Sequence, residues 1–237
     1  MKYILQPYIA FLYYSSMEET PKILAVYTVV VDIEPMTTGS TTRETWRDQN
    51  GDIHRDNDLP ARIYRDAKTG EINERHWYQN GMLHRDNDQP AIIDDDSSNL
   101  YYINGVQHRE KGPAEYYETD EGLRLSEYYY INGKFHREDG PACLSRCSIT
   151  GVVGSESYWI NGELSRDDGP ASIERWEDTG IATLEEWYKD GELYRPDGKP
   201  PIIERDRETG VITKEAYEHE AKQKPSAPLP SQPILEP

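Results

Sequence analysis

The sequence predicts an all-β protein: an elongated antiparallel β-meander made of about six two-stranded repeat units. Two observations predict this fold. A phrase of 14 or 15 residues recurs six times along the chain, which is the signature of a repeat array. Each copy also contains an Asn-Gly or Asp-Gly pair, the strongest short signal for a β-hairpin. No segment has a sustained 3.6-residue apolar period, so no long helix is expected.

The repeated phrase turns at a glycine and continues into a bend that contains proline. The turn glycines are spaced by 30, 24, 28, 29 and 29 residues. The copies are RDQNGDIHRDNDLPA (47–61), WYQNGMLHRDNDQPA (77–91), YYINGVQHREKGPA (101–114), YYINGKFHREDGPA (129–142), YWINGELSRDDGPA (158–171) and WYKDGELYRPDGKPP (187–201). Hairpin tips are expected at Gly51, Gly81, Gly105, Gly133, Gly162 and Gly191.

Two aromatic residues precede the turn in every copy except the first, which has Trp46 one step earlier. Consecutive residues of a strand point to opposite faces, so each copy should supply one ring to each face of the sheet. The second rings share one repeat phase and are expected to stack as a column. They are Tyr102, Tyr130, Trp159 and Tyr188.

A second turn separates successive phrases, as at Thr150-Gly151 and Thr179-Gly180. The unit is therefore two strands joined by two alternating turns. The prolines of the bend lack an N–H, so they should interrupt the strand ladder.

The two ends of the chain differ in composition from the repeats, which we assign to residues 43–220. Within residues 1–42, the apolar segment 23–31 predicts a capping strand. The first 16 residues are expected to be an extension or a strand rather than a secretion signal, because Pro7 interrupts their apolar stretch. Residues 221–237 contain five prolines and are expected to be a disordered tail, with a polyproline ligand as the alternative.

The composition narrows the function classes. The net charge of −18, nearly all of it in the repeats, excludes a basic nucleic-acid binder. No apolar run is long enough for a polytopic membrane protein. Only 35% of the residues are hydrophobic, yet there are 18 Tyr against 2 Phe. Tyr suits a half-buried surface, where the ring packs and the hydroxyl stays in water.

The recurring His-Arg pair is expected to be structural. Catalysis needs one preorganised set of side chains, whereas here six similar copies place equivalent residues at regular intervals along the sheet. We expect the Arg side chains to pair with carboxylates of adjacent copies and the His rings to pack on Tyr. We therefore expect no enzymatic activity, no catalytic residue and no cofactor.

Metal binding is not expected either. The segments Asp56–Asp58 and Asp86–Asp88 predict Asx turns rather than calcium loops, because no bidentate Glu follows at a fixed spacing. Cys143 and Cys147 are expected to be reduced thiols, as in a cytoplasmic protein.

The phrases resemble the MORN-variant repeats of the antitoxin type over roughly residues 43–215. In that family a strand carries E-x-x-Y-x-x-G-x-L, as in Glu185–Leu193 here. The Gly-rich segment of classical MORN repeats is replaced by His-Arg-x-Asp-Gly-Pro-Ala. That variant looks like repeat proteins common in bacteriophages and large DNA viruses, so the resemblance implies a viral or bacterial source.

Together these features predict a non-enzymatic protein-interaction module in the cytoplasm, with an acidic and aromatic surface. The expected partner is a protein with a basic surface, not a nucleic acid or a membrane. The alternative is a viral or antitoxin-type inhibitor that blocks a host protein, as an acidic mimic. The candidate binding residues are Glu138, Asp139, Asp167, Asp168, Tyr102, Tyr130, Trp159 and Tyr188.

Overall fold

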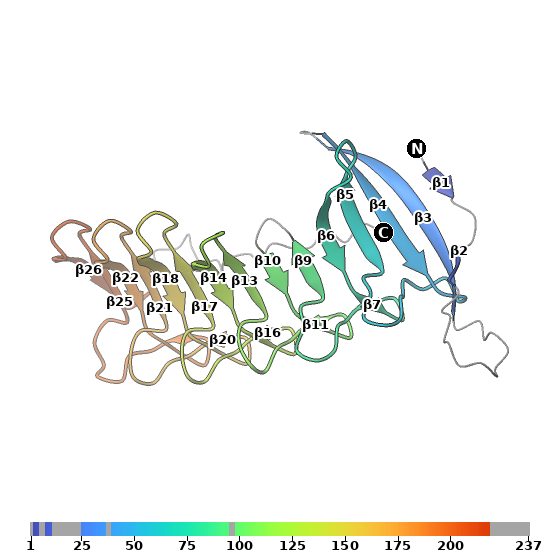
Figure 1. The fold of residues 1–237 in the computed structure, drawn as a ribbon. Helices are drawn as coiled ribbons and strands as arrows, with labels where there is room; N and C mark the ends of the chain where they lie inside the picture. Colours follow the sequence, from blue (N-terminus) through green and yellow to red (C-terminus); the bar gives the residue numbers. More distant parts are fainter. Residues whose placement is uncertain (1, 5–7, 11–24, 37–38, 95–97, 219–237) are drawn as a thin grey trace.

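A computed structural model describes residues 2–4, 8–10, 25–36, 39–94 and 98–218. This part of the chain is all strand and turn, without a helix, which confirms the predicted fold class. Sixteen strands form one antiparallel sheet that runs the length of the molecule (Figure 1). The proline-rich tail and residues 11–24 lie outside the described residues.

The sheet begins with strands from the N-terminal segment. These are β1 (Lys2–Ile4), β2 (Tyr8–Ala10), β3 (Ala25–Met36) and β4 (Gly39–Arg47). The strand predicted over 23–31 is confirmed as β3, which pairs with β4 from Thr28↔Arg47 to Met36↔Gly39. Its other edge pairs with β1 and β2. The N-terminal strands thus continue the sheet of the repeats.

Six two-stranded units follow, as the repeat count predicts. They are β5 (Arg62–Asp66) with β6 (Ile72–His76), β9 (Ile92–Asp94) with β10 (Ser98–Leu100), β13 (Glu115–Glu118) with β14 (Arg124–Tyr128), β17 (Cys143–Arg146) with β18 (Val153–Ser157), β21 (Ser172–Arg175) with β22 (Ala182–Glu186), and β25 (Ile202–Arg205) with β26 (Ile212–Ala216). Five of the six contain a register shift near the Thr-Gly turn, as between Ser145 and Arg146.

The repeated phrases do not extend these strands. Five of them fold as separate hairpins of two-residue strands along the lower side of the sheet in Figure 1. They are β7 (Tyr78–Gln79) with β8 (Met82–Leu83), β11 (Tyr102–Ile103) with β12 (Val106–Gln107), β15 (Tyr130–Ile131) with β16 (Lys134–Phe135), β19 (Trp159–Ile160) with β20 (Glu163–Leu164), and β23 (Tyr188–Lys189) with β24 (Glu192–Leu193). Five of the six units therefore have four strands, not the two of a simple meander, and the first phrase forms only an isolated bridge between Arg47 and Ile53.

The first aromatic residue of each phrase is where the chain leaves the main sheet. At Tyr129, the N–H donates to the carbonyl of Ala142, which follows the bend proline. The Tyr129 carbonyl accepts from the N–H of His136 across the small hairpin. Both backbone groups are thus used by the bend and the hairpin, so the β14 ladder ends.

The tips of the small hairpins form as the Asn-Gly signal predicts. Asn132 and Gly133 have φ of 51° and 74°, so both lie in the left-handed region of a type I′ turn. Gly133 is required for a second reason, because a Cβ there would lie 3.1 Å from Val106 Cγ1 of the preceding copy. All six predicted tip glycines have positive φ.

The core lies between the small hairpins and one face of the main sheet. The predicted column is present, but its rings alternate with a residue from the other strand of the hairpin. Phe135 lies between Tyr130 and Trp159, with ring centroids 4.4 Å and 5.5 Å away. Leu83 and Leu164 occupy the same position in their copies and are buried. The core is therefore a mixed aromatic and aliphatic stack.

One copy places polar groups at this level of the core. Gln107 stands where the other copies have Ile, Leu or Phe, and its Nε2 donates to Glu115 Oε2 at 2.8 Å. The Glu115 side chain is fully buried and also accepts from the Tyr117 hydroxyl at 3.1 Å. The amide and the carboxylate thus compensate for each other inside the array.

Candidate interaction surface

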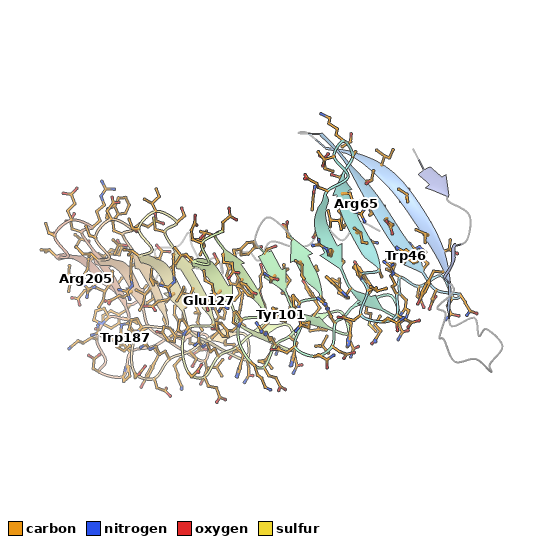
Figure 2. The ribbon with its side chains drawn as sticks, viewed as in Figure 1. Trp46, Arg65, Tyr101, Glu127, Trp187 and Arg205 are labelled. Carbon is orange, nitrogen blue, oxygen red and sulfur yellow. The ribbon has the colours of Figure 1, made fainter. Side chains whose placement is uncertain are left out.

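The bends after the small hairpins are held by the repeated arginines. Each guanidinium lies over the first aromatic ring of its own copy, at 3.7 Å for Arg55 on Trp46 and 4.0 Å for Arg137 on Tyr129. The same Arg donates through Nη1 to the carbonyl of the bend proline, as Arg137 does to Pro141 at 3.3 Å. This stacking recurs in all six copies. Three of the rings, Trp46, Tyr101 and Trp187, are spread along the length of the array (Figure 2).

The expected pairing of these arginines with adjacent copies is only half right. Arg85 and Arg109 do reach back, to Asp58 at 2.8 Å and Asp88 at 2.9 Å. Arg137 and Arg166 instead pair within their own bends, with Asp139 and Asp168. The bends differ in length: those of Asp58 and Asp88 have one more residue between Arg and Pro, and this brings the carboxylate to the next copy.

Four of the predicted binding residues form the exposed edge of these bends. The exposed fractions of the side chains are 86% for Glu138, 84% for Asp139, 83% for Asp167 and 82% for Asp168. We call these four residues the acidic row. A hydrogen bond from Arg137 lowers the pKa of Asp139, and one from Arg166 lowers the pKa of Asp168. Both carboxylates are therefore ionised at neutral pH.

The repeated histidines connect one copy to the next, a role the sequence did not reveal. His136 Nδ1 accepts the backbone N–H of the next turn residue, Asn161, at 3.1 Å. Nδ1 must therefore be unprotonated, and the ring proton sits on Nε2. His54, His84 and His108 make the same contact. In the fifth copy Ser165 Oγ accepts from the Asp190 N–H at 3.2 Å, so Ser can substitute for His.

Backbone hydrogen bonds complete each junction. The N–H of Gly162 donates to the carbonyl of Phe135 at 2.9 Å, and the N–H of Arg137 donates to the carbonyl of Trp159 at 3.1 Å. Equivalent pairs recur at neighbouring junctions. The small hairpins are thereby joined into a continuous second layer.

An apolar strip lies on the outer side of this second layer, near the turns. Met82, Ile103 and Val106 are exposed by 44%, 37% and 43%, and we call these three residues the apolar strip. Each copy contacts the next: the ideal Cβ position at Gly105 lies 3.7 Å from the Met82 side chain. Sequence reasoning missed the strip. Its signal is the apolar residue beside the Asn-Gly turn, which becomes Lys134 or Glu163 in later copies.

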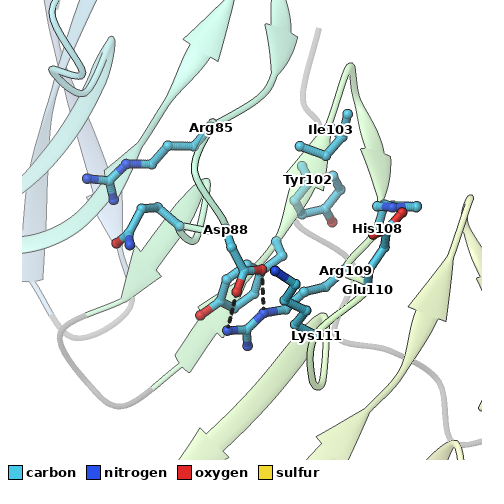
Figure 3. A pocket seen from close by; sticks show the side chains of 10 residues that line it. Arg85, Asp88, Tyr102, Ile103, His108, Arg109, Glu110 and Lys111 are labelled. Atoms are coloured by element: carbon cyan, nitrogen blue, oxygen red, sulfur yellow. Dashed lines mark hydrogen bonds and ion pairs between the residues drawn. The ribbon is translucent and has the colours of Figure 1, made fainter.

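A recess of about 280 Å³ lies between Ile103 of the apolar strip and the bends of the second and third copies. It lies between the second and third copies, where the turn glycines are closest in sequence, and its lining includes Tyr101, Ile103, Arg109 and Glu110 (Figure 3). The Arg109–Asp88 ion pair crosses one side of it. Apolar and charged groups are therefore within reach of a single bound segment.

The aromatic residues among the predicted binding residues lie elsewhere. Tyr102, Tyr130 and Tyr188 are buried in the core, and Trp159 is half-buried. Burial raises the pKa of all three tyrosines. The structure therefore brings the four acidic candidates together on the surface and places the four aromatic candidates in the packing beneath it.

The described residues contain no cluster of three or more His, Cys, Asp or Glu side chains that could hold a metal ion. Cys143 and Cys147 are both free thiols. A search of the same part of the chain for a helix long and apolar enough to span a membrane found none.

Comparison of the chain with models of protein families, with curated proteins and with solved structures gave no match.

Proposed function

We propose that the chain is a non-enzymatic protein-interaction module that binds a partner with a basic surface. The observation that carries this proposal is the acidic row, whose four side chains are more than 80% exposed in successive bends. Neighbouring strands of a sheet lie about 4.8 Å apart, and each copy adds two strands to the main sheet, so equivalent residues of successive copies are about 10 Å apart. The row thus offers two pairs of carboxylates in neighbouring bends, to which Lys or Arg side chains at a similar separation are complementary.

Electrostatics support a protein ligand over a nucleic acid. A chain with net charge −18 repels polyanions and attracts cationic surfaces, and it raises the rate of association with them at low salt. The apolar strip supplies the contacts that salt does not screen. Binding should accordingly have a salt-sensitive part from the bends and a salt-insensitive part from Met82, Ile103 and Val106.

The repeated His-Arg pairs support a non-enzymatic role. The Nδ1 atom of each His accepts a backbone N–H, and each Arg is held by a ring and a carbonyl. These groups are used in building the junctions and bends. We further propose that the repeats are MORN-variant repeats, on the strength of the phrase resemblance.

A narrower form of the proposal is an antitoxin-type or viral inhibitor that occupies a basic host protein in the cytoplasm. The two neighbouring acidic bends favour it, since exposed carboxylates that follow one another along a surface imitate the charge of a nucleic-acid backbone. The two free thiols accord with a reducing compartment.

The test compares two variants with the same change in charge. One carries Glu138→Gln, Asp139→Asn, Asp167→Asn and Asp168→Asn. The control carries Asp120→Asn, Glu121→Gln, Asp178→Asn and Glu208→Gln, at exposed positions in turns at the other end of the main-sheet strands. Proteins captured from a lysate by the wild-type chain are then titrated with all three chains at low and high salt.

We expect the acidic-row variant to lose affinity at low salt, while the control variant stays close to the wild type. Equal affinity of all three chains would remove the acidic row from the binding surface. Recognition would then fall to the apolar strip or to residues 221–237.

A further inference from the structure

The chain contains five Asn-Gly pairs, and each lies at the tip of a repeated phrase. Asn-Gly is the pair at which asparagine most readily loses its side-chain amide, because the glycine nitrogen reaches the amide carbon without hindrance from a side chain. All five asparagines are exposed, so exposure does not distinguish them: Asn50, Asn80, Asn104, Asn132 and Asn161. The hydrogen bonds at the tips do distinguish them.

The later four tips are anchored to the preceding copy through two backbone N–H groups. The N–H of Asn132 donates to His108 Nδ1 at 3.1 Å, and the N–H of Gly133 donates to the carbonyl of Gln107 at 2.8 Å. The same two bonds recur at the pairs that begin with Asn80, Asn104 and Asn161. The glycine nitrogen of each pair therefore cannot move unless two copies separate.

The preceding copy also fills the space beside these four glycines. An ideal Cβ position at Gly81 lies 3.6 Å from Asp52 Oδ1, and the one at Gly162 lies 3.5 Å from the Lys134 side chain. Beside Gly51, by contrast, the described part of the chain places no atom within 4 Å of that position, apart from its chain neighbours. The first tip thus has room to change its conformation.

The first tip is closed by Asp48, within its own loop. The Asp48 carbonyl accepts the N–H of Gly51 at 3.1 Å. The Asp48 carboxylate accepts the N–H of Asn50 at 2.9 Å and that of Asp52 at 3.0 Å. Asn50 also lacks the positive φ of the other four asparagines, so its turn is of a different type. A local fluctuation of this exposed loop breaks these bonds without opening the sheet.

We propose that Asn50 deamidates spontaneously in the folded chain, while the four later tips are protected. The Gly51 nitrogen leaves its bond to Asp48, gives its proton to hydroxide and attacks Cγ of Asn50. A bond from this nitrogen to Cγ closes a succinimide ring as the Cγ–Nδ2 bond breaks. The amide nitrogen takes a proton from water and leaves as ammonia. Water then opens the ring at either carbonyl and gives aspartate or isoaspartate.

The modification changes only the start of the array. Either product replaces a neutral amide by a carboxylate, between Asp48 and Asp52. In isoaspartate the main chain also runs through Cβ, so the lengthened loop cannot keep all its bonds to Asp48. The adjacent Ile53 carbonyl accepts the N–H of Gly81 at 3.0 Å, so a displaced tip weakens the first junction. The acidic row lies in the fourth and fifth copies, so binding of a basic partner is unaffected.

Mass spectrometry of tryptic peptides can follow each tip separately. Cleavage after Arg and Lys places every Asn-Gly pair in its own peptide, and Asn50 falls in residues 48–55. The full-length chain is incubated in mildly alkaline buffer and, in parallel, in guanidinium chloride. Deamidation raises the peptide mass, whereas isomerisation at the Asp-Gly pairs of the bends does not, so the reading is specific to asparagine.

In buffer, Asn50 should deamidate about tenfold faster than any of the other four, because the loss of one backbone hydrogen bond already corresponds to a factor of about ten. In guanidinium chloride the five rates should converge, since the copies no longer protect their tips. His108→Ala removes the acceptor of the Asn132 N–H and should raise the rate at Asn132, while Asn161 serves as the matched control.

Similar rates at all five tips in buffer would overturn the proposal, as would a faster reaction at any later tip than at Asn50. An unchanged rate at Asn132 in the His108→Ala variant would equally overturn the protective role of the junction.

Discussion

The buried pair of Gln107 and Glu115 gives a double-mutant cycle with a large expected coupling. The second copy has Leu83 and Ile92 at the equivalent positions, and both are buried. The double variant Gln107→Leu/Glu115→Ile therefore converts the third copy to a packing that the array already contains. Each single variant breaks the pair and leaves one polar group behind.

The expected magnitudes follow from the contacts. Gln107→Leu removes the 2.8 Å hydrogen bond to a fully buried carboxylate and should lower the free energy of unfolding by about 3 kcal/mol. Glu115→Ile leaves the half-buried amide, which should cost about 1–2 kcal/mol. The double variant should lie within about 1 kcal/mol of the wild type or exceed it, because an apolar replacement of a buried polar pair is close to neutral.

Urea unfolding, followed by tryptophan fluorescence and circular dichroism, measures all four chains. The expected coupling energy is about 3–5 kcal/mol, whereas independent sites add within about 0.5 kcal/mol. Additive effects would refute the reasoning, since they would mean that Gln107 does not compensate Glu115 in solution.

Three further predictions test the core, the junctions and the response to alkali. Tyr130→Ala should lower the free energy of unfolding by about 3–5 kcal/mol in urea melts, because the ring is 4% exposed and stacks on Phe135; a loss under about 0.5 kcal/mol would contradict its burial. His108→Ala should lower the free energy of unfolding by about 0.5–1.5 kcal/mol, because it removes the acceptor at Nδ1. His108→Ser should recover part of this loss, since Ser165 accepts the equivalent N–H in its own copy. Equal losses in the two variants would show that this hydrogen bond does not stabilise the junction. Burial raises the pKa of Tyr101 from 10.0 to about 12, so the stability that its neutral hydroxyl contributes is complete below pH 10 and is lost as the pH rises toward 12. Absorbance at 295 nm should show tyrosinate forming late, together with unfolding, and early ionisation of every tyrosine without unfolding would contradict this.

The sequence was sufficient for the repeating features that depend on local chemistry. The left-handed turns at Asn132-Gly133 and the strand β3 follow from residue type alone. Separation of the phrases into their own hairpins was not predictable in this way. It depends on hydrogen bonds between Tyr129 and Ala142, 13 positions apart, which no local signal encodes.

The candidate surface was predictable only in part. Exposure of Glu138 and Asp139 follows from their place in a polar bend. The roles of Arg137 and His136 could not be predicted from their place in the phrase. That of Arg137 depends on the ring of Tyr129 beneath it, and that of His136 depends on the backbone N–H of Asn161 in the next copy. For Arg137, the available signal was the spacing of eight residues between ring and Arg, as from Tyr129 to Arg137, which five of the six copies share.

The register shifts near the Thr-Gly turns recur at one place in five of the six units. An extra residue in one strand increases the local right-handed twist, so each of these units adds a similar increment of rotation. Rows of side chains that follow the repeat are consequently helical paths, not straight lines. A rigid, flat ligand can follow such a path over only a few neighbouring units before the surface turns away. Lengthening the array would then add more binding sites for such a ligand, without raising the affinity of any one site.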